Sequence, residues 1–176
     1  GKEIMLIYNK KLSVVPLTTH IAIKNIAKKI NFRFIKNKIY HLIAGYYSVF
    51  KKKPKIAVLG LNPHNGESRS DTEEKKIIIP VIKFLKKNKH KIYGPFSSDT
   101  FFASNKILKY DIVLGMYHDQ VLTPFKTIFK FDACNITLGL KYFRVSPDHG
   151  TAEDIIGKKK ANPISLVKSI DFISNI

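Results

Sequence analysis

The stretch Ile56-Ala57-Val58-Leu59-Gly60-Leu61 lacks the alternation of polar and apolar residues that a half-exposed strand shows. A strand of this kind is buried on both faces, as in a parallel sheet that is covered by helices. A second run of the same kind is Ile112-Val113-Leu114-Gly115-Met116. The two runs predict an α/β fold whose sheet has helices on both sides.

Strand-like and helix-like segments alternate along the rest of the chain, which supports the α/β class. We expect further strands at residues 4–8, 12–17, 135–140 and 143–145. We expect helices at residues 21–30, 37–52, 71–88 and 163–173, the third of them kinked by Pro80.

The chain is strongly basic, with 31 lysines and arginines against 13 acidic residues and a formal charge of +18. Only Arg33, Arg69 and Arg144 are arginines, although arginine is the preferred reader of phosphate and guanine. The lysines are spread along the chain beside abundant Ile, Asn, Phe and Tyr, residues with A/T-rich codons. Genome composition therefore explains the charge better than a nucleic-acid-binding surface does.

Composition also limits where the protein works. No apolar run approaches the roughly 20 residues of a membrane-spanning helix. The single cysteine, Cys134, excludes an internal disulfide and fits a reducing cytoplasm. The start Gly1-Lys2-Glu3-Ile4 has neither a signal-peptide layout nor an initiating Met, so we expect residues upstream to be missing. We expect a cytoplasmic protein with no membrane and no nucleic-acid partner.

Three of the six histidines follow the carboxyl end of an expected strand: His20, His64 and His118. Ligands of open α/β sheets bind at these strand ends, so the three side chains could converge on one site. Three neutral imidazoles suit a catalytic divalent metal and leave a position open for substrate. The spacings of 44 and 54 residues match no local metal motif, however. Each histidine alone could equally be a hydrogen-bonded loop residue.

Other polar residues lie near the same loops. Asp99 and Asp119 could orient a metal-binding imidazole, although Asp99 could instead cap a helix. Lys126, Asn135 and Arg144 lie near the ends of strands or loops, where they could hold a phosphate or carboxylate group. A lysine in so lysine-rich a chain could equally be a surface residue.

The usual dinucleotide-binding fingerprint, Gly-x-Gly-x-x-Gly, does not occur in the sequence, and neither does a Walker motif. The candidate cofactor segment is His149-Gly150-Thr151-Ala152-Glu153-Asp154. Its glycine permits close approach of a ligand to the backbone, and its threonine could cap a short helix.

Several separate blocks together resemble the 4-hydroxythreonine-4-phosphate dehydrogenase family. In order along the chain they are Thr18-Thr19-His20, Gly60-Leu61-Asn62-Pro63-His64-Asn65-Gly66-Glu67, Gly94-Pro95 with Asp99-Thr100, Met116-Tyr117-His118-Asp119-Gln120, Asn135-Ile136-Thr137-Leu138-Gly139-Leu140 and Asp148-His149-Gly150-Thr151-Ala152. The resemblance covers essentially the whole chain and matches the C-terminal half of the family.

The resemblance implies a homodimer in which one divalent metal (Zn, Mg, Co or Mn) is held by His20, His64 and His118, at a site shared between subunits. It implies contacts of Lys126, Asn135 and Arg144 with a phosphorylated hydroxy-amino-acid substrate, and catalytic roles for Asp99 and Asp119. The reaction would be NAD-dependent oxidation of 4-phosphooxy-threonine and decarboxylation to 3-amino-2-oxopropyl phosphate, in the biosynthesis of pyridoxal phosphate (vitamin B6).

The resemblance also implies a fold of the isocitrate/isopropylmalate dehydrogenase type, a three-layer α/β/α domain with a mixed sheet, here incomplete. Residues 1–147 would form the second domain, which carries the metal and substrate sites and the dimer contacts. Residues 148–176 would form a cofactor loop and a C-terminal helix that returns toward a first domain absent from this chain. The residues expected at NAD are His149, Gly150, Thr151, Ala152 and Asn162, although Asn162-Pro163 also suits an ordinary helix start.

Two other classes of function stay open at this point. The same histidines could serve a metal-dependent hydrolase or lyase that uses no NAD. The basic surface could instead belong to a module that binds an acidic polymer such as nucleic acid. If the family assignment is right, we expect this half-length chain to be inactive alone.

Overall fold

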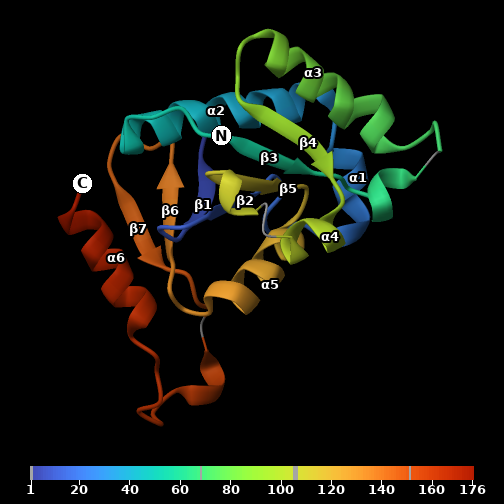
Figure 1. Ribbon diagram of the computed structural model, residues 1–176. Helices are drawn as coiled ribbons and strands as arrows, with labels where there is room; N and C mark the ends of the chain where they lie inside the picture. The colour runs from blue at the N-terminus through green and yellow to red at the C-terminus, as the bar shows by residue number, and fades with distance from the viewer. Residues whose placement is uncertain (1, 68, 105–106, 151) are drawn as a thin grey trace.

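One sheet of seven strands organises the computed structural model, which describes residues 2–67, 69–104, 107–150 and 152–176 (Figure 1). The strand order across the sheet is β4-β3-β5-β2-β1-β6-β7. The strands are β1 (Ile4–Tyr8), β2 (Ser13–Pro16), β3 (Ile56–Leu59), β4 (Ile92–Phe96), β5 (Ile112–Gly115), β6 (Cys134–Leu138) and β7 (Arg144–Pro147).

The sheet is mixed, as predicted. β4, β3, β5 and β2 run parallel, whereas β1 is antiparallel to both β2 and β6, and β7 is antiparallel to β6. β5 lies between β2 and β3, and its Ile112 pairs with Ser13 of β2 and with Ile56 of β3. The carboxyl ends of these three strands therefore meet at one edge of the sheet.

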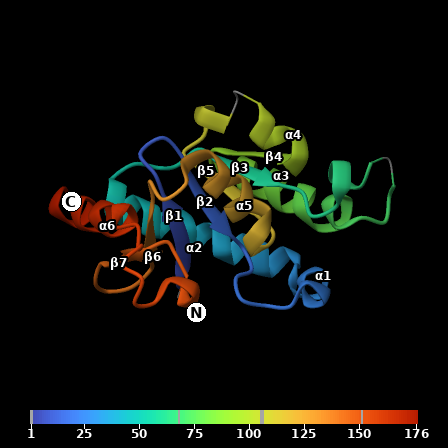
Figure 2. The same cartoon turned by 90° about the horizontal axis from the view of Figure 1, so that it is seen from below.

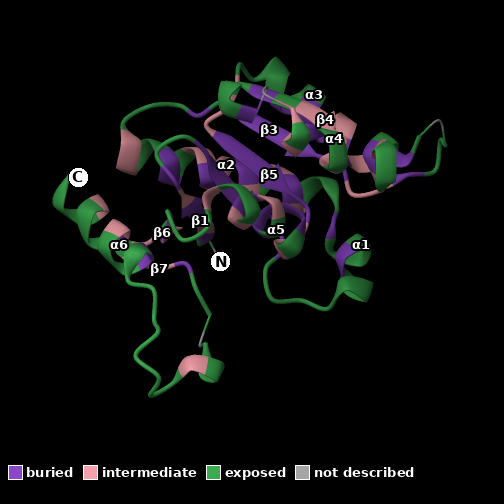
Figure 3. Cartoon of the chain, turned by 60° about the horizontal axis from the view of Figure 1, so that its bottom comes forward, coloured by how far each residue is buried: buried purple, intermediate pink, exposed green. Residues whose placement is uncertain are grey.

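Helices cover both faces of the sheet, which confirms the three-layer α/β/α prediction (Figures 1 and 2). α2 (Phe32–Phe50) and α3 (Ile79–Lys87) pack on one face, and α4 (Ser98–Ala103) and α5 (His118–Phe129) pack on the other. Every residue of β3 and β5 is buried, so the two apolar runs are core strands (Figure 3). Ile56 and Val58 face α2 and α3, while Ala57 and Leu59 face α4 and α5.

α2 illustrates how local sequence sets an element. Asn31 caps the helix by accepting a hydrogen bond from the Phe34 N–H at 2.9 Å, and Lys51 ends it in a left-handed conformation. Its buried residues, Ile35, Ile39, Leu42, Gly45 and Tyr46, recur at helical spacing. The expected start at residue 37 was wrong because the capping asparagine lies six positions earlier.

The other expected helices differ in detail from the structure. Residues 21–30 form two short turns, η1 (Ile23–Asn25) and α1 (Ile26–Lys29), because only Ile26 of these turns reaches the core. The helix expected at 71–88 begins with a π-helical turn, η3 (Glu74–Ile78), which ends two positions before Pro80. The missing N–H of Pro80 prevents a regular ladder there. The final helix, α6 (Ile164–Ser174), lies one residue from its expected bounds.

Three elements were not predicted: β4, α4 and α5. The pair Gly94-Pro95 inside β4 is typical of a turn, and Pro124 inside α5 is typical of a helix end. β4 tolerates its proline because it is the last strand of the sheet, at an edge. The remaining short turns are η2 (Pro63–Gly66), η4 (Ile107–Lys109) and η5 (Glu153–Ile155).

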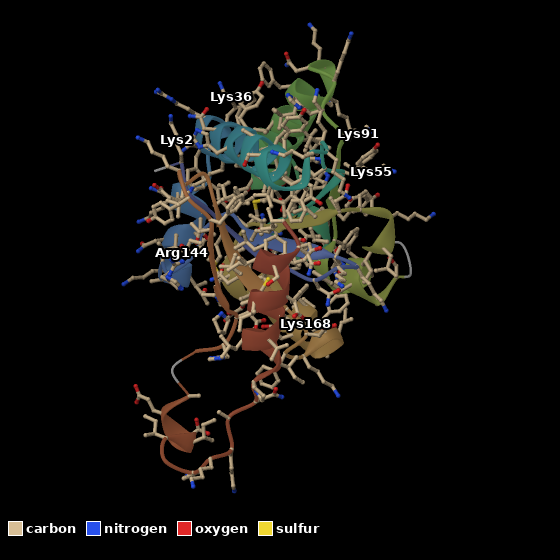
Figure 4. The ribbon with its side chains drawn as sticks, turned by 90° about the vertical axis from the view of Figure 1, so that its left-hand side faces the viewer. Lys2, Lys36, Lys55, Lys91, Arg144 and Lys168 are labelled. Atoms are coloured by element: carbon tan, nitrogen blue, oxygen red, sulfur yellow. The ribbon has the colours of Figure 1, made fainter. Side chains whose placement is uncertain are left out.

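The segment after β7 leaves the sheet as an exposed arm and returns as α6 along β6 and β7 (Figures 1 and 3). No helix in the described part of the chain combines the length and apolar character needed to cross a membrane. Cationic side chains arise from helices, strands and loops along the whole chain, as the labelled ones show: Lys2, Lys36, Lys55, Lys91, Arg144 and Lys168 (Figure 4). Their dispersal agrees with the even spread of lysines along the sequence.

Gly94 has a backbone φ of +122°, and a Cβ at this position would lie 2.3 Å from the Val58 carbonyl oxygen. Gly94→Ala should therefore lower the free energy of unfolding by at least about 2 kcal/mol, since both the backbone conformation and the clash oppose it. Urea unfolding followed by circular dichroism measures the loss. The matched control is Gly150→Ala, whose Cβ would meet nothing within 4 Å. Equal stability of the two variants would contradict the prediction.

Candidate metal and substrate site

Two of the three predicted metal-binding histidines meet at the carboxyl edge of β2 and β5. The ring centroids of His20 and His118 lie 5.9 Å apart. Thr18 brings them together, because its backbone N–H and its hydroxyl both donate to the Met116 carbonyl, at 3.2 and 2.7 Å. This buried threonine extends the pairing of β2 with β5 beyond the strand ends and fixes the start of both loops.

His118 is the first residue of α5 and lies against its neighbour Asp119. Its Nδ1 is 2.6 Å from the Asp119 Oδ1 atom. A carboxylate accepts hydrogen bonds, so a neutral His118 in this contact carries its proton on Nδ1 and has its lone pair on Nε2. Asp119 thus orients the imidazole as a carboxylate that supports a metal-binding histidine does.

His64 lies on the loop after β3, and the structure places it beside Asp99 rather than in a cluster with the other two histidines. Its Nδ1 is 3.6 Å from Asp99 Oδ2, and its side chain is 63% exposed. Within the described residues, no group of three or more His, Cys, Asp or Glu side chains is arranged to hold a metal. The chain alone therefore brings together two of the three predicted ligands.

Asp99 stands in the first turn of α4, where the residue before the helix, Ser97, occupies the cap position. The Ser97 hydroxyl donates to Asp99 Oδ1 at 2.7 Å. This hydrogen bond, together with the Thr100 N–H and the nearby His64 imidazole, holds the pKa of the Asp99 carboxyl below its usual range. Asp99 is therefore an exposed carboxylate that faces His64 and not the helix cap considered from sequence.

The loop that carries His64 is unusual in its backbone. His64, Asn65 and Gly66 have φ angles of 48°, 56° and 72°, in the left-handed region that non-glycine residues rarely adopt. Glu74, which is 1% exposed, holds the loop by accepting from the Leu61 and Asn62 N–H groups, each at 2.7 Å. Its other oxygen accepts from the Asn62 side chain at 2.9 Å.

Gln120 provides a second anchor, between the strand ends and α4. Its Nε2 donates to the Gly60 carbonyl at 2.6 Å and to the Ser98 hydroxyl at 2.7 Å. Its Oε1 accepts from the Met116 N–H at 2.6 Å. Sequence reasoning assigned no structural role to Gln120 and saw Glu74 only as a charge favourable to a helix start. The sequence could have indicated the role of Glu74, because an acidic residue shortly after a loop can accept hydrogen bonds from the unpaired backbone N–H groups of that loop.

A cavity of about 340 Å³ opens beside His20, on the β1, β2 and β6 part of the sheet. It is lined in part by Thr19, His20, Lys38, Asn135, Thr137 and Arg144. Arg144 Nη1 donates to the Thr137 hydroxyl at 2.9 Å, and these two residues are paired across β6 and β7. Asn135 Oδ1 is buried and has no hydrogen-bond partner among the described residues.

The remaining predicted substrate residue, Lys126 of α5, is not among the residues that line this cavity. Its ammonium donates to the Asp148 carbonyl at 2.5 Å and lies 3.7 Å from Asp148 Oδ2. The structure therefore brings Asn135 and Arg144 to the cavity with His20, whereas Lys126 is held at the end of β7.

The predicted cofactor segment belongs to the exposed arm. A Cβ on Gly150 would meet nothing within 4 Å, and Ala152 has a φ of 50°, so this backbone is open to an approaching ligand. His149 Nδ1 is 3.0 Å from the Gly150 carbonyl oxygen. Asn162 Oδ1 accepts from the Ile164 N–H at 3.0 Å, the helix-start role considered from sequence. Thr151 lies outside the described residues.

Glu74→Gln tests whether the Glu74 carboxylate holds the His64 loop. Burial alone would raise the pKa of this carboxyl, but hydrogen bonds from Asn62, from its own N–H and from Leu61 outweigh burial and lower it. A lowered pKa means that the carboxylate stabilises the fold above its ordinary pKa of about 4.3 and loses this effect as the pH falls. At pH 7 the variant should be less stable by about 1.5–3 kcal/mol.

Thermal or urea unfolding from pH 7 to pH 3 measures this difference, which should shrink at the acid end. Glu153→Gln, which changes an exposed carboxylate, serves as the control and should follow the wild type throughout. A deficit of Glu74→Gln that stays constant down to pH 3 would show that charge plays no part.

Comparisons with known proteins identify the family of the chain. Residues 1–173 match the family model described as "Pyridoxal phosphate biosynthetic protein PdxA". Over 99% of the chain, 40% of residues are identical to a 4-hydroxythreonine-4-phosphate dehydrogenase of Bradyrhizobium diazoefficiens, of which the match covers 51%. For the enzyme of that name from a Sulfurihydrogenibium strain the identity is 41%, over 95% of the chain and 52% of the relative.

Solved structures give the same result. The crystal structure of 4-hydroxythreonine-4-phosphate dehydrogenase from Klebsiella pneumoniae superposes with a TM-score of 0.83 at 34% identity, covering 99% of this chain and 54% of that one. A terephthalate dihydrodiol dehydrogenase from Burkholderia xenovorans, at 23% identity and a TM-score of 0.74, shares the fold. The chain spans about half the length of the curated relatives it matches. It belongs to the PdxA family of pyridoxal phosphate biosynthetic proteins.

Proposed function

We propose that this chain provides the metal- and substrate-binding part of a dehydrogenase that oxidises 4-phosphooxy-threonine with NAD, followed by decarboxylation to 3-amino-2-oxopropyl phosphate. The observation that carries the proposal is the meeting of His20 and His118 beside a cavity that Asn135 and Arg144 also line. The family and the names of its members support the reaction class. Because the chain matches half of each relative, we expect it to need further protein for activity.

The donor set fits a divalent metal. His118 is oriented by Asp119 so that Nε2 is the free donor, and His20 lies within ring contact of it. We propose His64 as the third ligand, in a homodimer whose subunits share the site, which is compatible with its exposed position. When bound, a Zn, Mg, Co or Mn ion would supply a Lewis acid for the substrate's alcohol, and NAD would supply the hydride acceptor.

The chain's own side chains would bind and orient the substrate. The Arg144 guanidinium has five N–H donors, of which one contacts Thr137, so others remain for two parallel bonds to phosphate or carboxylate. Asn135 lines the same cavity, and its side-chain amide would contribute to the substrate contacts. Lys126 would add a positive charge, and Asp99 and Asp119 would act through the two histidines that they contact.

We propose that residues 1–147 form the metal, substrate and dimer domain, and that residues 148–176 bear the cofactor loop and a helix that packs on another part of the complete enzyme. The open backbone at His149, Gly150 and Ala152 supports a role in NAD binding, with Thr151 and Asn162 nearby in sequence. The outer face of α6 exposes large apolar residues, which supports a covering partner: Leu166, Val167, Ile170 and Ile173. The buried free thiol of Cys134 is compatible with a cytoplasmic location.

The activity is tested with the full-length protein from which this sequence comes. NADH formation at 340 nm with 4-phosphooxy-threonine should require a divalent metal, and a chelator should abolish it. Arg144→Ala should raise KM for the substrate by tenfold or more, because the phosphate contact is lost. A tenfold rise corresponds to a loss of about 1.4 kcal/mol of binding free energy. Metal-dependent turnover of a substrate without NAD would instead favour a hydrolase or lyase.

The metal site is tested by His64→Ala. This side chain is 63% exposed, so its removal should leave the fold intact while the protein loses its bound metal. Metal analysis of the dialysed protein by mass spectrometry measures the ion content, and circular dichroism checks the fold. His90→Ala is the control, because His90 contacts Tyr40 and lies before the amino end of β4, at the opposite edge of the sheet from the site, and this variant should keep its metal. One ion per site in the His64 variant would remove His64 from the ligand set.

A further inference from the structure

Asp148 connects the end of β7 with Lys126 on α5. The Asp148 side chain is fully buried, whereas the Lys126 side chain is 35% exposed. The Lys126 ammonium donates to the Asp148 carbonyl oxygen and lies 3.7 Å from its Oδ2. An ammonium has three N–H donors. Asp148 accepts one of them through its carbonyl oxygen and attracts the ammonium through Oδ2, and the partial exposure of Lys126 leaves an N–H for a ligand.

Ser165, in the first turn of α6, fixes Asp148 in turn. The Asp148 N–H donates to Ser165 Oγ at 2.8 Å, and this oxygen is also 2.8 Å from Asp148 Oδ1. Ser165 Oγ is 2.7 Å from the Ala133 carbonyl, directly before β6. Ser165 is 0% exposed, so these contacts are shielded from water. The packing of α6 on the sheet therefore sets the conformation of Asp148.

The charge of the Asp148 carboxylate also holds the Lys126 ammonium in place. Its Oδ2 is buried and has no hydrogen-bond partner among the described residues. A buried carboxylate oxygen without a partner is costly unless a cation compensates it, and the Lys126 ammonium stands within ion-pair distance. The attraction keeps the ammonium beside Asp148, at the end of β7. Asp148 lies two positions after Ser146, which pairs with Asn135.

We propose that Asp148 is a positioning residue, which holds the Lys126 ammonium toward an anionic group of the ligand, and that Ser165 fixes Asp148 for this task. The inference rests on the proposed function in one respect, the role of Lys126 in binding the substrate phosphate. Asp148 itself is too deeply buried to touch a ligand. In this proposal the packing of α6 on the sheet controls the position of the Lys126 ammonium.

The first test measures the rate at which each lysine of the 176-residue chain reacts with an acetylating reagent, by peptide mass spectrometry. Asp148→Asn should increase the rate at Lys126 by about two- to fivefold, because the ammonium loses a charged partner. The matched control is Asp132→Asn, which removes the Asp132 partner of Lys168, 3.0 Å away. It should accelerate Lys168 and leave Lys126 unchanged, and Asp148→Asn should do the reverse.

The second test measures KM and kcat of the full-length protein, together with the Kd of inorganic phosphate. In Asp148→Asn, KM and Kd should rise by about two- to fivefold while kcat stays within about twofold, a split that general loss of folded protein would not produce. Ser165→Ala, which keeps the carboxylate, should shift the Lys126 rate in the same direction.

An unchanged Lys126 rate in Asp148→Asn overturns the proposal, and if that variant does not fold, an unchanged rate in Ser165→Ala overturns it. Failure of the proposed function looks different. If Lys126→Met binds phosphate as the wild type does while Asp148→Asn still accelerates labelling of Lys126, then Asp148 does hold the lysine. In that outcome the substrate role of Lys126 is wrong.

Discussion

The parallel pairing of β5 with β2 and β3 is the constraint on which the candidate site depends. Ile112 of β5 pairs with Ser13 on one side and Ile56 on the other, so three strands end at one edge. Each strand is buried on both faces, and a slip of one residue would turn its apolar side chains toward the wrong layer. The core therefore fixes the register, and the register fixes where the loops that bear histidines begin.

Strand ends leave backbone groups without partners, and two buried polar side chains satisfy them here. Glu74 accepts from the loop after β3, and Gln120 joins the Gly60 carbonyl to the Met116 N–H. Unpaired, these groups would cost about 1–3 kcal/mol each in a buried position. The same contacts that stabilise the loops also limit the conformations open to His64 and His118, so stability and placement of the site have one origin.

The sequence predicts those parts of the fold that follow from periodicity, and fails where local and long-range signals conflict. The buried strands at 56–61 and 112–116 were predicted because apolar runs have few alternatives. β4 and α5 were missed because Pro95 and Pro124 suggest breaks, whereas an edge position and packing on the sheet outweigh them. The nearness of His20 and His118 followed from strand ends, but the pairing of His64 with Asp99 depends on a left-handed loop that sequence spacing does not reveal.

The face of the sheet toward α5 changes its chemistry across its width. On β3 and β5 it carries Ala57, Leu59 and Val113, which pack against α4 and α5 as core. On β6 and β7 the same face carries Asn135, Thr137 and Arg144, because Asn135 pairs with Ile7 of β1 and Thr137 with both Met5 and Arg144. One half of the face is thus filled by this chain's own helices, and the other half presents hydrogen-bonding groups to a cavity. A single sheet face can therefore form part of the core on some strands and a ligand surface on others. The side chains at alternate positions of each strand, apolar or polar, decide between the two roles.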